Sequence, residues 1–177
     1  LTSNPGNDGY PSWSPDGSKI AFQSVLDSTF GNTIYVMDAD GSNQTRLISN
    51  NDLLVFDDDK YPSWSPVGSK IAFMSYRDGN WEIYVMDADG SNVTRLTNNS
   101  VFDGTPAWSP DGPKIAFASG RDGDDDIYVM DADGGNVRQL TDDPGGDWTP
   151  DWSPDGTKIA FVSVPDQGGE DEIYVMN

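Results

Sequence analysis

The chain has 177 residues, and its 30 acidic and 10 basic side chains give a formal net charge of −20. Such a surface repels nucleic-acid phosphates and anionic lipid headgroups and attracts cations and basic partners. The sequence contains no cysteine and no histidine, which excludes disulfides, Ser-His-Asp and Cys-His catalysis and the common zinc sites.

Four copies of one sequence unit follow one another along the chain. The segment Pro-Ser-Trp-Ser-Pro-Asp-Gly at 11–17 returns in closely similar form at 62–68, 106–112 and 150–156. Each copy continues with Lys-Ile-Ala-Phe and Ile-Tyr-Val-Met, and the first three add Asp-Ala-Asp-Gly and a final Arg-Leu or Gln-Leu. The repeated tryptophans, Trp13, Trp64, Trp108 and Trp152, are 51, 44 and 44 residues apart. A period of this length is typical of β-propeller blades.

Each copy predicts four short strands. The first passes through the tryptophan, the second is Lys-Ile-Ala-Phe, the third is Ile-Tyr-Val-Met, and the fourth ends in Arg-Leu-Thr. The second and third strands are almost continuously apolar, which indicates sheets that are covered on both faces. Radial stacking of such sheets gives an all-β propeller of four-stranded antiparallel blades. We expect one domain over 1–177, with blades at about 10–47, 61–96, 105–140 and 149–176.

The last copy stops after Ile-Tyr-Val-Met, so its blade is expected to lack the outer strand. An unpaired sheet edge is an adhesive surface. Three interpretations follow. The chain is a fragment of a larger propeller, it associates with other copies of itself, or it closes alone as a four-bladed ring.

The composite of Trp-Ser-Pro-Asp-Gly, Lys-Ile-Ala-Phe, Ile-Tyr-Val-Met-Asp-Ala-Asp-Gly and Arg-Leu-Thr resembles the repeats of the TolB-like β-propeller family. The resemblance covers essentially the whole chain. It implies a periplasmic or extracellular module that binds partner proteins, a six-bladed ring, and calcium bound in an acidic channel. Related propellers also gate serine peptidases, so the fold does not settle the function.

A column of aspartates lies three residues before the repeated proline: Asp8, Asp59, Asp103 and Asp147. These positions enter the innermost strands, so the four carboxylates are candidates to rim one mouth of the central channel. Ca²⁺ accepts six to eight oxygen ligands in loose geometry and suits such a site. The alternative is that each aspartate only caps its own loop.

A second column follows the second strand: Asp27, Asp78, Asp122 and Asp166. In the second and third copies an arginine, Arg77 or Arg121, directly precedes the aspartate. The simplest interpretation is a local Arg–carboxylate pair in a turn, which contributes little stability when exposed. The functional alternative is a second ring of cation ligands on the same face.

Two departures from the repeat are candidate partner-binding surfaces. The loop 49–60 is five residues longer than its equivalents and contains Leu53, Leu54 and Phe56. Trp81 and Trp148 are tryptophans outside the repeated positions. Apolar residues in loops mark contact sites or fold back over the core.

These features favour a non-enzymatic scaffold for protein interaction or assembly, with calcium as the predicted ion. One alternative is a structural subunit that polymerises through its open blade edge. A second is a carboxylate-based carbohydrate-active enzyme, since two carboxylates catalyse glycoside hydrolysis without histidine. Asp151, which replaces Ser12, Ser63 and Ala107, is the most asymmetric candidate for that chemistry.

Overall fold

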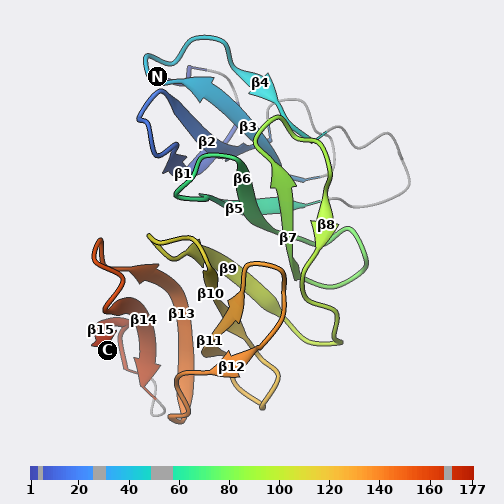
Figure 1. Cartoon of the computed structure of the whole chain (residues 1–177). Coiled ribbons are helices and arrows are strands. Elements are labelled where there is room, and N and C mark those ends of the chain that lie inside the picture. The colour runs from blue at the N-terminus through green and yellow to red at the C-terminus, as the bar shows by residue number, and fades with distance from the viewer. Residues whose placement is uncertain (4–5, 26–30, 49–57, 166–168) are drawn as a thin grey trace.

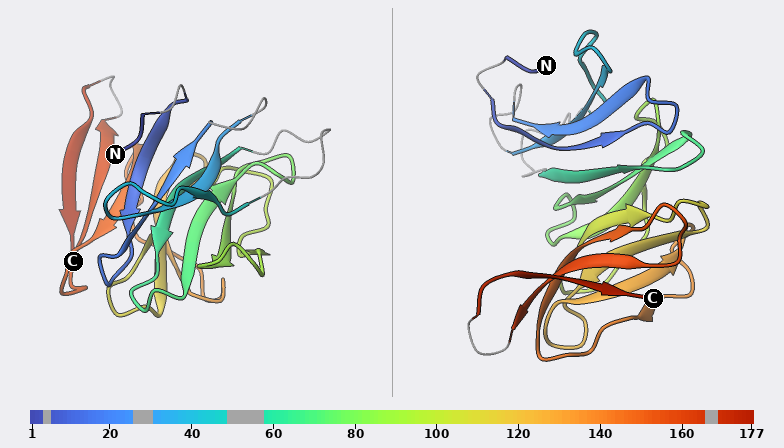
Figure 2. Two further views of the ribbon diagram at one scale, coloured as in Figure 1. Left: turned by 90° about the horizontal axis from the view of Figure 1, so that it is seen from above. Right: turned by 90° about the vertical axis from the view of Figure 1, so that its left-hand side faces the viewer.

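The structure is a computed structural model, and it describes residues 1–3, 6–25, 31–48, 58–165 and 169–177. Four antiparallel sheets stand side by side in an arc (Figure 1). Figure 2 shows them stacked from the N-terminal to the C-terminal sheet. The predicted all-β propeller is confirmed: three blades have four strands each and the last has three.

Each blade is a meander in which consecutive strands pair. Blade one contains β1 (Asp8–Trp13), β2 (Lys19–Ser24), β3 (Thr33–Asp38) and β4 (Thr45–Arg46). Blade two contains β5 (Asp59–Trp64), β6 (Lys70–Ser75), β7 (Glu82–Asp87) and β8 (Thr94–Arg95). Blade three contains β9 (Asp103–Trp108), β10 (Lys114–Ser119), β11 (Asp126–Asp131) and β12 (Arg138–Gln139). Blade four contains β13 (Gly145–Trp152), β14 (Ile159–Pro165) and β15 (Glu172–Met176).

The apolar runs of the second and third strands form the contacts between blades. Ile71 and Phe73 of β6 belong to a buried cluster with Ile34 of blade one. Ala72 and Met74 of the same strand belong to a cluster with blade three. Because successive side chains of a strand point to opposite faces, an uninterrupted apolar strand is the sequence signature of a sheet held between two others.

The innermost strands share a backbone irregularity. In each of them the register shifts by a bulge just before the repeated proline. The residue at this point has a positive φ near 50° in all four blades: Tyr10, Tyr61, Thr105 and Thr149. A left-handed conformation at such residues costs about 1–3 kcal/mol each. The bulge re-aims these four side chains, which line the channel described below.

Within the described part of the chain, no helical segment has the length and hydropathy of a membrane span.

Candidate functional site

The innermost strands of the four blades line one common cavity, which we call the channel. It has a volume of about 440 Å³, with Tyr10, Tyr61, Thr105 and Thr149 among the lining residues. Asp151 is the only acidic residue in this lining among the described residues. The described lining of this cavity thus supplies one carboxylate, whereas a glycosidase uses a pair.

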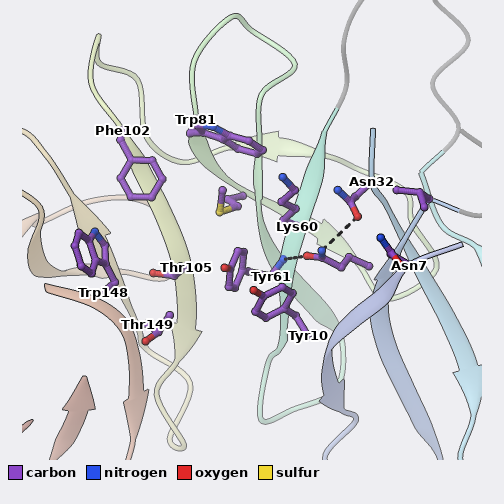
Figure 3. Close-up of a pocket in the computed structure, with 13 residues that line it drawn as sticks. Asn7, Tyr10, Asn32, Lys60, Tyr61, Trp81, Phe102, Thr105, Trp148 and Thr149 are labelled. Carbon is purple, nitrogen blue, oxygen red and sulfur yellow. Dashed lines mark hydrogen bonds between the residues drawn. The ribbon is translucent and has the colours of Figure 1, made fainter. Parts of the chain in front are cut away.

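An aromatic pocket of about 610 Å³ continues the channel at one end. We define the aromatic pocket by its five ring-bearing lining residues: Tyr10, Tyr61, Trp81, Phe102 and Trp148. The same four positive-φ residues line both cavities, so the pocket opens directly into the channel. Figure 3 shows Tyr10 and Tyr61 side by side near its centre, with Phe102 and Trp148 coming from the neighbouring blades.

The rings of the aromatic pocket are held by specific contacts. The Tyr10 and Tyr61 ring centroids are 4.0 Å apart, and burial and the neighbouring Tyr10 raise the pKa of Tyr61. Lys60 Nζ lies 4.9 Å from the centroid of the Trp81 ring, a cation–π contact. The Trp148 indole Nε1 donates to Asp125 Oδ2 at 2.7 Å. Anchored aromatic side chains of this kind bind ligands at a low entropic cost.

A polar edge completes the aromatic pocket on the side of blade one. The backbone N–H of Tyr61 donates to Gln23 Oε1 at 3.3 Å, and Gln23 Nε2 donates to Asn32 Oδ1 at 3.3 Å (Figure 3). Lys60 Nζ pairs with Asp58 at 2.6 Å. The pocket thus combines an apolar floor with a few fixed polar groups, the usual composition of a binding site.

The predicted partner-binding residues divide into two groups. Trp81 and Trp148, which come from different blades, line the same pocket. Leu53, Leu54 and Phe56 lie outside the described residues. The role of all five in binding stays a prediction.

Three members of the first aspartate column lie inside the blades, whereas Asp8 is half-buried. Asp59, Asp103 and Asp147 have no exposed surface. Each member of the column is paired in register with a serine of the second strand, as in Asp8 with Ser24 and Asp59 with Ser75.

Arginines from the loop after the second strand neutralise two of these buried carboxylates. Arg77 donates to Asp59 Oδ1 at 2.9 Å and to Ser75 Oγ at 2.9 Å. Arg121 donates to Asp103 at 3.1 Å and to Ser119 Oγ at 2.9 Å. The predicted local pairs within each turn are therefore wrong, because each arginine reaches back across the sheet to the first column.

The same two guanidinium groups lie over aromatic rings. Arg77 Cζ is 5.4 Å from the Phe73 centroid and 4.8 Å from that of Tyr84. The corresponding distances from Arg121 are 5.4 Å to Phe117 and 4.6 Å to Tyr128. We call this arrangement of buried Asp, Ser and a Phe–Tyr ring pair the arginine cradle. The arginine cradle is not evident from the sequence, and its one signal there is that Arg77 and Arg121 recur at the same position of the repeat.

The second aspartate column is only partly described. Asp78 accepts a hydrogen bond from the Tyr84 hydroxyl and one from Arg95 at 3.1 Å. Asp122 accepts one from the Tyr128 hydroxyl. Asp27 and Asp166 lie outside the described residues. In blades two and three this column therefore orients the tyrosine of the arginine cradle.

These arrangements bear on the predicted calcium site. Among the residues that the structure describes, no group of three or more Asp or Glu side chains is placed to hold a metal ion. Asp59 and Asp103 already have a guanidinium as counter-ion. Calcium binding by either column stays a prediction, and melting with Ca²⁺ or EDTA tests it.

Comparison with known proteins identifies the repeat. The model of the TolB beta propeller domain matches residues 1–102 and 25–177. The chain belongs to this family. No match is found among curated proteins.

Two solved TolB structures have the same fold as this chain. Putative TolB from Agrobacterium tumefaciens is 30% identical with a TM-score of 0.83, over 97% of this chain and 61% of its own. TolB from Acinetobacter baumannii is 32% identical with a TM-score of 0.85, over 99% of this chain and 42% of its own. The chain thus spans less than two thirds of these relatives.

A puromycin hydrolase shares only the fold with this TolB-family chain. It is 18% identical with a TM-score of 0.73, over 94% of this chain and 26% of its own.

Proposed function

We propose that this TolB-family chain is a non-enzymatic interaction module that binds a segment of a partner protein in the aromatic pocket. The convergence of Trp81 and Trp148 with Tyr10, Tyr61 and Phe102 at one end of the channel carries the proposal. Tryptophan and tyrosine in concave sites dominate the energetics of protein interfaces. The family resemblance, which implies binding of partner proteins in the periplasm or outside the cell, supports the same function.

An extended segment suits this site better than a small metabolite. The pocket opens into the channel, so a bound chain has a continuous path along residues of all four innermost strands. The strongly negative surface favours a basic segment, because opposite charge accelerates encounter and suppresses unsuitable partners. Lys60 is already paired with Asp58 and does not reverse this preference.

Peptide display against the immobilised chain tests the proposal. We expect the selected peptides to lose about 30-fold in affinity for Trp81→Ala and for Trp148→Ala, the usual effect of removing an aromatic hot spot. Trp13→Ala is the matched control, since Trp13 is 56% exposed and lies outside the pocket. Peptides that bind both pocket variants as tightly as the natural chain would place the interaction surface elsewhere.

A further inference from the structure

The junction between blades three and four differs in charge from the junction before it. Two acids, Glu82 and Asp103, are buried between blades two and three. Each has an arginine: Arg95 lies 2.7 Å from Glu82, and Arg121 lies 3.1 Å from Asp103. The buried acids of this junction are therefore electrically balanced by cations of the chain itself.

The equivalent acids of the next junction are Asp126 and Asp147, both buried. Gln139 stands where blade two has Arg95 and donates to Asp126 at 2.8 Å. Pro165 stands in the sequence where the other two blades have Arg77 and Arg121. Within the described ranges, no lysine or arginine pairs with either aspartate.

Asp147 is the more exceptional of the two. It has no exposed surface, and neither of its carboxylate oxygens accepts a hydrogen bond from the described residues. Burial raises its pKa, and the charges of Asp143 and Asp124 raise it further. The nearby hydroxyls of Ser163 and Thr141 lower the pKa and offset this rise in part, although neither is in hydrogen-bonding geometry and the Thr141 hydroxyl donates to Asp126 instead. A buried carboxylate in these surroundings attracts a cation.

Blade four retains every part of the arginine cradle except the arginine. Ser163 is paired in register with Asp147. The Phe161 and Tyr174 rings are 5.9 Å apart at 28°, against 5.8 Å and 28° for Phe73 and Tyr84. The Tyr174 side chain is 44% exposed, whereas that of Tyr84 is 3% exposed and lies beside the outer strand β8.

We propose that blade four binds a guanidinium group supplied by an arginine side chain of a partner protein. Asp147 and Ser163 accept its hydrogen bonds, and the rings of Phe161 and Tyr174 lie against its plane, as blades two and three do for Arg77 and Arg121. Guanidinium fits this site because it is planar, donates in a fixed fork and stacks on aromatic rings, whereas ammonium is a compact, strongly hydrated charge.

This inference deepens the proposed function by naming a side chain of the partner. The two sites share strand β13, in which Trp148 of the aromatic pocket directly follows Asp147. A basic segment bound along the pocket therefore passes close to the cradle of blade four.

Titration with Nα-acetyl-arginine amide tests the site without knowledge of the partner. We expect one binding site, with an affinity at least about ten-fold higher than for the acetyl amides of citrulline and lysine, because citrulline has no charge and lysine has no fork. Asp147→Asn is expected to abolish this preference. Asp111→Asn makes the same change of charge at an exposed turn and is expected to leave the affinity unchanged.

Arg121→Ala supplies an internal test, because it opens the cradle of blade three. We expect this variant to bind two equivalents of the arginine amide and to regain melting temperature when the amide is added. If Arg121→Ala does not fold, the comparison of Asp147→Asn with Asp111→Asn decides alone.

Three results would overturn the proposal: equal affinity for arginine and citrulline, arginine binding retained in Asp147→Asn, or Ca²⁺ that binds through Asp147 and excludes the arginine amide. Trp81→Ala separates this site from the proposed function. We expect it to weaken the selected peptides while it leaves binding of the arginine amide intact.

Discussion

The guanidinium of Arg121 lies 3.1 Å from the carboxylate of Asp103, although 18 positions separate the two residues. The contact crosses blade three from the loop after β10 to the first residue of β9. A carboxylate without exposed surface is costly unless it is paired and hydrogen-bonded. The arginine therefore explains why an aspartate is tolerated at this buried position, and the same explanation does not extend to Asp147.

Asp103→Asn and Asp147→Asn are expected to change stability in opposite directions. Asp103→Asn breaks a buried ion pair and leaves Arg121 without its counter-ion, so we expect a loss of about 3 kcal/mol. Asp147→Asn removes a buried charge that has no partner among the described residues, so we expect no loss, or a gain. Urea unfolding followed by tryptophan fluorescence measures both. Similar losses for the two variants would show that the folded chain stabilises the Asp147 carboxylate to the same extent as the Asp103 carboxylate.

The stabilising effect of Asp147→Asn is expected to depend on pH. Burial raises the pKa of Asp147 above the ordinary value of 3.8. Between the two pKa values the folded chain keeps a proton that the unfolded chain has released, so stability falls as pH rises through this window. The variant has no such loss. We expect the gain in stability of Asp147→Asn over the natural chain to be absent near about pH 3 and complete at neutral pH.

Urea midpoints of the two proteins across this pH range provide the measurement. Asp126, whose pKa is also raised by burial, remains in both proteins and cancels in the comparison if the two sites are independent. A difference that stays constant with pH would mean that Asp147 titrates at its ordinary value.

The fold was predictable because the repeat fixes it at several levels. The turns of Gly17 and its equivalents, the apolar second and third strands and the period near 44 residues all indicate the same blade. Each blade also repeats the packing of the last, so one correct assignment predicts the others.

The site was less predictable, because its contacts join distant segments. Trp81 and Trp148 depart from the repeat in sequence, but only the radial arrangement of the blades places both at one end of the channel. Arg77 is adjacent to Asp78 in sequence but pairs with Asp59, because the register sets Ser75 opposite Asp59. Proximity along the chain was therefore a misleading guide to the charge pairs.

Val67→Asp is expected to stabilise blade two. The corresponding Asp16 of blade one accepts hydrogen bonds from Ser14 Oγ at 2.7 Å and from the backbone N–H of Ser18 at 3.0 Å. Val67 is 76% exposed and cannot accept such bonds. We expect the melting temperature to rise by about 1–3 °C at neutral pH, the scale on which single surface improvements act in a chain of this size.

The gain from Val67→Asp should disappear in acid. The hydrogen bonds from Ser14 and Ser18 lower the pKa of Asp16 to about 2. A carboxylate with a lowered pKa contributes its stability above the unfolded value and loses it as pH falls through the folded value. Melting curves of the variant and the natural chain should therefore converge near about pH 2. A gain that persists there would point to the loss of the exposed valine as its cause.

Gly90→Ala is expected to loosen the contact between blades one and two. Gly90 lies in the turn between β7 and β8 with φ +87, and a Cβ added there would lie 2.3 Å from the carbonyl oxygen of Leu47, at the end of blade one. Gly79 is the matched control, since it has φ +93 but no atom within 4 Å of an added Cβ. Both substitutions incur the cost of a left-handed alanine, about 1–2 kcal/mol. Only Gly90→Ala must also displace backbone of the neighbouring blade, so we expect its loss in urea unfolding to exceed that of Gly79→Ala by about 1 kcal/mol or more. Equal losses would mean that the turn of blade two moves away from Leu47 without disturbing the packing of the two blades.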